Sequence, residues 1–591
     1  MQKMISIKKF LSIVSLMVVT FLLLQVPVLV KERANNYNIN RYVRNTGINS
    51  ENVWKASSKD PVAFFIGKSS SPVKNMMEIW SGYRRYALKC ADSVEDIGKD
   101  QYNIMVIDLK ELSPDKAGKI AKTAANNGKI VVLAGVENAL KKENNKELKE
   151  SLGIYKVRDE SVKTEGVHLY DGFLLGGEAI YKPKDQKEYK ERMDLDEKIP
   201  WLTLNSGTKI FAVGLLPDEM NIDKGSIGEE WMPPLFWRYS YGDGFVYGII
   251  GDYMEEVSGV GILDAIISDV KSYDIYPVVN AQNLTVLNFP TMADENTAVL
   301  TSIYSMPLTK VMSELVCPEL YNLNSASSFR MTCMMTTQYD YKDEVEPTDC
   351  KQWIKYLKMM NEDGWEPGLS MYSKSDISAE NKFLTDFHYI KKTGSKYPYS
   401  SIYANDEEVS KGARQLDSII TASVPYNVNL APFGLSEDNL SLQRITDFAF
   451  HHTYKDDIRT RCFETALAYT NILYDMENIA FPVEMSDQIE YYIEQCNANI
   501  ATYWKPFAAF QKTVLSESDE RVRRFLNLTF TESRKGNTIN LTTDEQTYFI
   551  LRTHGEEVES VAGGTCDMIE EGAYLLYSNG RTMEITLENE N

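Results

Sequence analysis

Histidine is scarce in this sequence, and the histidines that are present are not spaced as metal ligands. Only five occur among 591 residues, and no two of them form an HxxxH or HExxH pair. The chain also lacks a GxSxG nucleophile elbow, and no cysteine stands in a recognisable nucleophile signature. The common hydrolase motifs are therefore absent. The histidines are His168, His388, His451, His452 and His554.

Cysteine pairs and phosphate loops are missing as well. The seven cysteines are scattered, without a CxxC pair or the spacing of a zinc ribbon, and their odd number leaves at least one thiol without an intramolecular partner. Gly67-Lys68-Ser69 follows a predicted strand, but Val62 stands where a phosphate loop needs a glycine. Nucleotide binding at this position is not expected.

Basic residues are in deficit. The chain has 63 Lys and Arg against 84 Asp and Glu, a formal charge of -21, and such a surface repels phosphate backbones. Nucleic acid is excluded as a partner on this ground, and most of the acidity is interpreted as solvated surface. With 43% hydrophobic and 25% charged residues, the chain has the composition of a folded protein, and its length accommodates two or three domains.

The N-terminus carries the one long apolar run, Phe10–Val30, which is long enough to cross a bilayer as a helix. It ends in Lys31, Glu32 and Arg33 instead of the small residues of a cleavage site, which indicates an uncleaved membrane anchor over 1–34, followed by an Asn- and Ser-rich linker over 35–59. Basic residues on both sides leave the orientation undecided by charge. The short N-terminal stub favours a single-pass protein of the cell membrane with an extracytoplasmic body.

Residues 60–273 alternate apolar strands at 61–67, 103–109 and 129–135 with segments of helical length, the βαβ pattern of a parallel sheet. We expect a Rossmann-like, flavodoxin-like or amidotransferase-like α/β domain here. Longer βα units follow over 274–527, where 353–360 places Trp353, Tyr356, Leu357 and Met360 on one face of a helix as core residues. After 528 the short strands NTINL, YFILR, VESV, YLLYS and MEITL predict a small C-terminal β-sandwich over 528–591.

The segment 361–374, NEDGWEPGLSMYSK, resembles the second motif of polysaccharide deacetylases, G-x-E-x-G-x-H-x-x-x-H with Ser before the last His. Gly364, Glu366, Gly368 and Ser373 match that motif. Ser370 and Lys374 stand where the family has its two metal-binding histidines.

The upstream segment YPVVNAQNLTVLNFP (276–290) resembles a motif of uncharacterised bacterial relatives of the Pel exopolysaccharide deacetylase, in which an aspartate pair precedes Phe-Pro. Leu287 and Asn288 replace the two aspartates. The segment TTQYDYKDE (336–344) offers Asp340 as a second place for the family's aspartate, and 450–457 and 503–528 resemble the same relatives. The resemblance implies a deacetylase-like (β/α) barrel over 274–527.

In that family, one Asp and two His hold a divalent cation, and a second Asp takes the proton from bound water. Serine is a weak neutral donor, and Lys374 would repel a cation. We therefore expect no metal site and no cofactor. The function predicted is an extracytoplasmic pseudo-deacetylase that binds or guides a polysaccharide in Pel-like exopolysaccharide biosynthesis or export.

The predicted ligand groove uses aromatic and neutral hydrogen-bonding side chains: Asp340, Trp365, Glu366, Ser370, Tyr372, Tyr426, Asn427 and Asn429. One alternative is an active metal-dependent deacetylase in which His451 or His452, beside Asp456 and Asp457, rebuilds a site with Asp340, so that Asp340 and His452 are the catalytic candidates. Adjacent residues on a strand point to opposite faces, so only one of the two histidines would normally serve. The other alternative is a structural subunit of a membrane synthase complex, with synthase or export proteins as partners.

Overall fold

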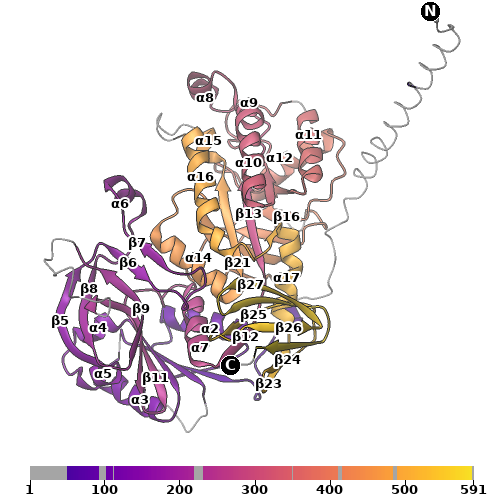
Figure 1. Cartoon of the computed structure of the whole chain (residues 1–591). Helices are drawn as coiled ribbons and strands as arrows, with labels where there is room; N and C mark the ends of the chain where they lie inside the picture. Colours follow the sequence, from indigo (N-terminus) through magenta and orange to yellow (C-terminus); the bar gives the residue numbers. More distant parts are fainter. Residues whose placement is uncertain are drawn as a thin grey trace, which may run out of the picture.

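The computed structural model describes Met17 and residues 50–91, 102–110, 112–217, 231–348, 350–409, 411, 415–482 and 489–588. Apart from Met17, the predicted membrane anchor over 1–34 lies outside these ranges, as does most of the linker. Within them, no helix combines the length and the apolar composition that crossing a bilayer requires. The described residues form a mixed α/β protein of several domains (Figure 1), which confirms the predicted fold class at that level.

A nine-stranded mixed sheet forms the first domain, with the strand order β2-β1-β3-β4-β11-β10-β9-β6-β7. The first five strands of this order run parallel, and the remaining four add in antiparallel fashion. Strands β1, β3 and β4 are almost wholly buried and coincide with the three apolar runs predicted as strands. The strands are β1 (Val62–Ile66), β2 (Ala87–Ala91), β3 (Ile104–Asp108), β4 (Ile130–Ala134), β6 (Gly166–Leu169), β7 (Ala179–Tyr181), β9 (Thr208–Leu215), β10 (Pro234–Tyr241) and β11 (Gly244–Ile249).

The helices of this domain begin where capping residues predict. Ser71 caps α2 by accepting a hydrogen bond from the Val73 amide at 3.1 Å, and Pro114 occupies the first turn of α3. A separate ribbon of β5 (Ile154–Lys163) and β8 (Lys198–Leu204) lies beside the sheet. The helices are α2 (Pro72–Arg84), α3 (Pro114–Asn126), α4 (Val136–Leu140), α5 (Lys146–Ser151), α6 (Gln186–Arg192) and α7 (Gly259–Val270).

Helix α7 forms a packing contact between the first domain and the barrel. It is buried along most of its length and packs against α14 (Tyr454–Leu467) of the barrel. A Cβ atom at Gly261 would lie 2.2 Å from the backbone oxygen of Cys462, so only glycine permits this close approach of the two helices.

The barrel is built from parallel strands in the order β19-β17-β16-β15-β14-β13-β21-β20. Only residues 445 and 446 separate β19 from β20, so one continuous segment borders β17 with its first half and β21 with its second. This segment joins the two edges of the sheet into a ring. The strands are β13 (Ala281–Leu287), β14 (Met331–Met335), β15 (Glu366–Ser370), β16 (Ser401–Tyr403), β17 (Thr421–Val424), β19 (Ser441–Arg444), β20 (Asp447–Phe448) and β21 (Tyr469–Asp475), with β18 (Phe433–Leu435) and β22 (Lys512–Thr513) added at the margins.

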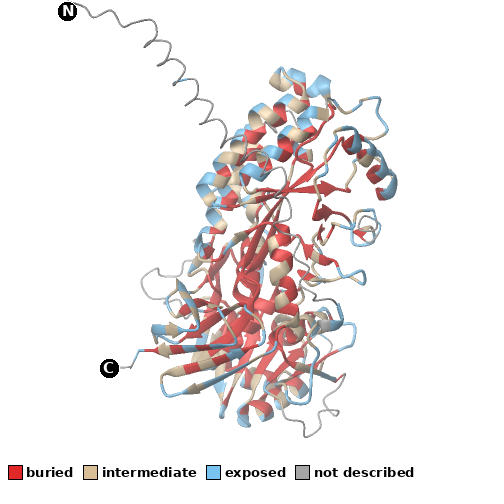
Figure 2. Cartoon of the chain, turned by 90° about the vertical axis from the view of Figure 1, so that its right-hand side faces the viewer, coloured by how far each residue is buried: buried red, intermediate tan, exposed pale blue. Residues whose placement is uncertain are grey.

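Helices surround the ring, and their outer faces carry most of the exposed residues, whereas the buried residues run along the strands (Figure 2). The predicted core face of 353–360 is confirmed, since Trp353, Tyr356, Leu357 and Met360 are the buried residues of α11. The helices are α8 (Thr297–Tyr304), α9 (Leu308–Val311), the π-helical turn η5 (Met312–Val316), α10 (Cys317–Ser327), α11 (Cys350–Glu362), α12 (Ala379–Lys392), α14, α15 (Glu477–Ala480), α16 (Ile489–Tyr503), the 3₁₀ turn η6 (Lys505–Phe507) and α17 (Leu515–Asn527).

The C-terminal module consists of two four-stranded sheets, β12-β25-β28-β27 and β23-β24-β29-β26, around one apolar core. The five predicted strands coincide with β24, β25, β26, β28 and β29. Strand β12 (Tyr273–Val278), assigned from the sequence to the start of the barrel, pairs with β25 and so belongs to this module. The remaining strands are β23 (Phe530–Lys535), β24 (Thr538–Thr543), β25 (Tyr548–Thr553), β26 (Val558–Ala562), β27 (Gly564–Glu570), β28 (Ala573–Ser578) and β29 (Thr582–Leu587).

Candidate functional site at the C-terminal face of the barrel

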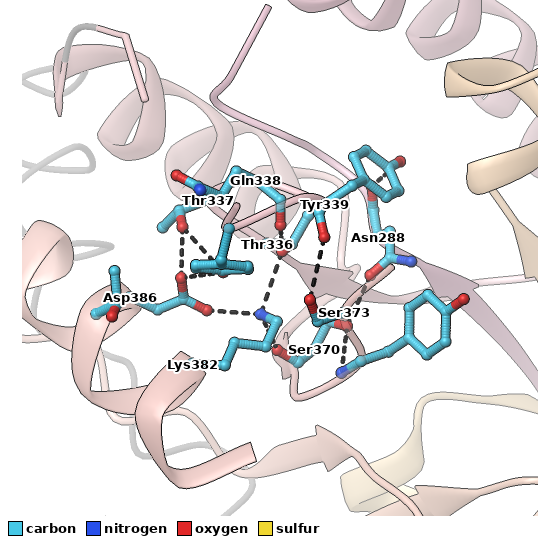
Figure 3. Close-up of polar contacts among 12 residues, drawn as sticks. Asn288, Thr336, Thr337, Gln338, Tyr339, Ser370, Ser373, Lys382 and Asp386 are labelled. Carbon is cyan, nitrogen blue, oxygen red and sulfur yellow. Dashed lines mark hydrogen bonds and ion pairs between the residues drawn. The ribbon is translucent and has the colours of Figure 1, made fainter. Parts of the chain in front are cut away.

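In a ring of parallel strands, the carboxyl ends of all strands meet at one face, which we call the C-terminal face. Asn288 directly follows β13 there, with a left-handed φ of 60° that asparagine tolerates better than most residues. Its side-chain oxygen accepts a hydrogen bond of 2.7 Å from the hydroxyl of Ser370, the last residue of β15 (Figure 3). Tyr339 donates its hydroxyl to the Asn288 carbonyl at 3.0 Å. Two positions at which the resemblance to deacetylases would place metal ligands therefore bond to each other.

Leu287, at the position of the family's first aspartate, has no polar role. Its side chain is 2% exposed and packs in one cluster with Met334, Tyr403 and Ile445. Three half-buried aromatic side chains pack against this cluster, and we call them the aromatic floor: Tyr372, Tyr426 and Phe448. The rings of Tyr426 and Phe448 meet edge to face at 6.1 Å.

Two carboxylates border the aromatic floor, those of Asp475 at the end of β21 and Glu477 at the start of α15. Burial raises the pKa of Asp475 to about 6, and its carboxylate accepts the Glu477 amide at 2.9 Å. Glu477 pairs with Lys374 at 3.0 Å, and a hydrogen bond to Glu477 helps burial to raise the pKa of Tyr372. The ammonium of Lys374, at the position of the family's second histidine, is thus neutralised by a carboxylate of the chain itself.

A buried ion pair supports this face from behind. The ammonium group of Lys382 on α12 is 2.6 Å from Asp386 and 2.7 Å from the carbonyl of Ser370, and Lys382 has no exposed surface. Asp386 also accepts hydrogen bonds from Thr337 and Tyr341 in the loop after β14 (Figure 3). The pair therefore connects α12 to the carboxyl ends of β14 and β15. The sequence analysis did not predict this ion pair, although the four-residue spacing of Lys382 and Asp386 on one helix is typical of such pairs.

Asp340 lies in the same loop, half-buried. Its carboxylate accepts the amide of Lys342 at 2.9 Å, and its own amide donates to Glu295 at 2.6 Å. Glu295 is 1% exposed, also binds the Tyr339 amide at 2.8 Å, and has its pKa raised to about 7 by burial. Glu295 is a further residue that the sequence did not single out, and it fixes the backbone of the loop that carries Asp340.

Trp365 and Glu366 lie at the opposite end of the barrel, because β15 begins at Glu366. Both carboxylate oxygens of Glu366 are bonded: one accepts the Ser400 hydroxyl at 2.8 Å, and the other accepts the amide and hydroxyl of Ser516 at 2.9 Å each. Ser516 is in the first turn of α17, so Glu366 acts there as a cap. Trp365 is 3% exposed and packs against Tyr321. Neither side chain reaches the C-terminal face.

The three remaining candidates lie where the barrel meets the first domain. Arg459 stacks over the ring of Tyr426 at 4.6 Å, so Tyr426 belongs both to the aromatic floor and to this border. The carbonyl of Asn429 accepts a hydrogen bond from Asn75 of α2 at 2.6 Å. The side chain of Asn427 accepts the Asn429 amide at 2.9 Å and thereby holds the turn.

His452 is enclosed by aromatic rings. It is 1% exposed, its ring centroid lies 4.2 Å from that of Tyr503 and 5.4 Å from that of Trp504, and neither ring nitrogen has a hydrogen-bond partner. Burial lowers its pKa to about 4. His451 points the other way, exposed and against Phe450. The two adjacent histidines therefore do not converge.

The stability of the protein is expected to depend on pH through His452. The folded chain holds the imidazole neutral, whereas the unfolded chain takes up a proton below about pH 6.5, so this contribution is complete above pH 6.5 and is lost as the pH falls to about 4. In His452→Phe, which keeps a ring between Tyr503 and Trp504, this loss disappears. Urea unfolding at pH 7 and 4.5 should show the wild type losing about 2–3 kcal/mol more than the variant. Parallel losses in both proteins would contradict the assignment.

The residues present do not fit a catalytic divalent cation. Among the described residues, no three His, Cys, Asp or Glu side chains gather in a way that could hold a metal ion. At the three positions where the resemblance to deacetylases would place metal ligands stand an amide oxygen and a hydroxyl already bonded to each other and an ammonium group, and an apolar side chain stands at the position of the aspartate that takes the proton. An ammonium group repels a cation, and neutral oxygens that are already paired are weak ligands.

No protein-family model and no curated protein matches the sequence. Among solved structures, the chain is similar to the carbohydrate deacetylase Agd3, with a TM-score of 0.48 and 8% identity over 90% of this chain and 99% of that one. Lesser likenesses are a β-galactosidase from Bacillus circulans sp. alkalophilus (TM-score 0.23, 11% identity, 37% of this chain and 33% of that one) and a ThuA-like protein from Bacteroides uniformis (0.20, 12%, 37% and 96%). Values this low assign neither a family nor an activity.

Proposed function

We propose that the chain binds a carbohydrate polymer at the C-terminal face of the barrel and does not deacetylate it by metal catalysis. The observation that carries the proposal is the half-buried aromatic floor of Tyr372, Tyr426 and Phe448, bordered by the carboxylates of Asp475 and Glu477. Sugar rings have an apolar face that packs on aromatic side chains and hydroxyl groups that bond to carboxylates and amides. The floor and its border offer both kinds of contact.

The contacts of the residues at the substituted positions support the absence of metal-dependent deacetylation. A metal-dependent deacetylase needs a carboxylate to take the proton from bound water. Leu287 cannot do so and instead joins the buried cluster beneath the floor. Asp340 remains, but its carboxylate bonds to the backbone of its own turn, and His452 is sealed away from solvent.

From the sequence we further propose a membrane anchor at Phe10–Val30 with an extracytoplasmic body, a place in Pel-like exopolysaccharide biosynthesis or export, and association with synthase or export proteins. A purely structural subunit of a synthase complex would show no glycan binding, and so the test of binding also separates that alternative.

Replacing Tyr372 with alanine is expected to weaken glycan binding at least about 10-fold, equivalent to about 1.4 kcal/mol, because the variant loses the ring on which a sugar would pack. Tyr372→Phe, which keeps the ring, should bind within about threefold of the wild type. Calorimetric titration of the full-length protein with N-acetylated and de-N-acetylated hexosamine oligomers measures this. Tyr155→Ala, at an exposed tyrosine of the first domain, is the matched control. Equal affinities for Tyr372→Ala and wild type would refute the proposed site.

A further inference from the structure

A second feature of the barrel has no part in the proposed sugar site. Helices α10 and α16 lie side by side on the outside of the ring (Figure 1), and a groove of about 610 Å³ runs between α16 and the segment formed by η5 and α10. This volume is in the range of pockets that bind ligands in other proteins.

The floor of the groove is apolar. It includes Leu315 from η5 and, from α16, Ile489 and Ile493, which lie four residues apart on one helical face. Leu315 is half-buried, whereas Ile489 and Ile493 are 3% and 4% exposed and continue into the core. The five residues Met312–Val316 form a π-helical turn, a local widening that is concentrated at functional sites in other proteins.

The rim of the groove is acidic on both sides. Glu314 and Glu319 project from one wall and Glu490 and Glu494 from the other, and the described residues that line the groove include no lysine or arginine. None of the four forms an ion pair or a side-chain hydrogen bond within the described part of the chain, although the same chain pairs many other carboxylates. Four like charges around an apolar floor repel each other, and a cationic occupant would relieve that repulsion.

We infer that this groove docks a basic amphipathic helix of a partner protein. Such a helix would place apolar residues at i, i+3 or i+4 and i+7 on the floor, and lysines or arginines on its flanks would pair with the four glutamates. An acidic or neutral helix would leave these carboxylates unpaired and partly desolvated, which is unfavourable. The charge of the rim therefore selects the partner, and the apolar floor provides the contact area.

The test is a titration of the purified full-length protein with a fluorescently labelled 18-residue helix made only of leucine and lysine on opposite faces, followed by anisotropy. Saturable binding is expected, weakened at least about 30-fold in Glu490→Lys/Glu494→Lys and at least about fivefold in Leu315→Asn, which alters the floor without changing charge. A helix of leucine and glutamate in the same pattern should not bind.

The matched control is Glu557→Lys/Glu559→Lys, the same charge change at exposed positions of the C-terminal module. It should bind the basic helix as the wild type does. Equal weakening in this control would mean that the peptide follows the overall charge, and the inference would fail. It would also fail if spermine displaced the helix at low concentration and Leu315→Asn bound normally, since the site would then recognise charge without a helix. Neither outcome bears on glycan binding at Tyr372.

Discussion

Lys382→Met is expected to destabilise the barrel by about 3–5 kcal/mol, because it leaves the buried carboxylate of Asp386 without its cation. In the wild type this ammonium also bonds to the Ser370 carbonyl, so the variant loosens the strand end that carries Ser370 as well. The midpoint of the barrel's thermal transition should fall by roughly 6–12 °C, measured by calorimetry of the full-length protein.

Two further variants show whether the expected loss comes from the unpaired carboxylate of Asp386. Lys382→Met/Asp386→Asn removes both charges and should recover a substantial part of the loss, since the remaining amide still accepts hydrogen bonds from Thr337 and Tyr341. Lys146→Met removes the lysine of an exposed helical pair with Glu150 and should leave the midpoint unchanged. A midpoint in Lys382→Met equal to that of Lys146→Met would show that the buried pair contributes nothing.

Glu366→Leu is expected to cost about 3 kcal/mol while leaving glycan affinity unchanged. The variant leaves the Ser516 amide and hydroxyl and the Ser400 hydroxyl without their acceptor in a buried position. Because Glu366 lies at the end of β15 away from the C-terminal face, no direct effect on a sugar is expected. Unfolding in urea and calorimetric glycan titration on the same preparation measure the two quantities.

Glu366→Gln distinguishes the loss of the capping hydrogen bonds from a general destabilisation of the fold. Glutamine keeps one oxygen for Ser516 and should lose only about 1 kcal/mol. Glu362→Gln, at an exposed position near the end of α11, is the control for removing a charge nearby. If Glu366→Leu folded normally but no longer bound sugar, Glu366 would be a ligand residue and its assignment as a cap would be wrong.

The sequence predicted the strands and helices well where local periodicity decides them. The buried runs of β1, β3 and β4 and the four core residues of α11 follow from side-chain spacing alone. Pairing between distant strands does not follow from local pattern. Strand β12 pairs with β25, which joins Tyr273 to Thr553, and nothing near Tyr273 indicates that it leaves the barrel.

The sequence brought together only part of the residues that lie at the C-terminal face. The resemblance to deacetylase motifs selected Asn288 and Ser370, which are 82 residues apart and hydrogen-bonded. It also selected Glu366, which lies at the wrong end of its strand to meet them, because a short motif does not reveal where a strand begins. The pair Lys382 and Asp386 has the spacing of an ordinary exposed helical pair, and only tertiary packing buries it.

Sugar binding at the C-terminal face without metal chemistry is tested by measuring glycan binding and acetate release together. The full-length protein is given an N-acetylated hexosamine oligomer, with zinc added or with a chelator. We predict the same saturable binding in both conditions and no acetate above a protein-free control. Acetate release that requires zinc and stops on chelation would show that the barrel is an active metal-dependent deacetylase.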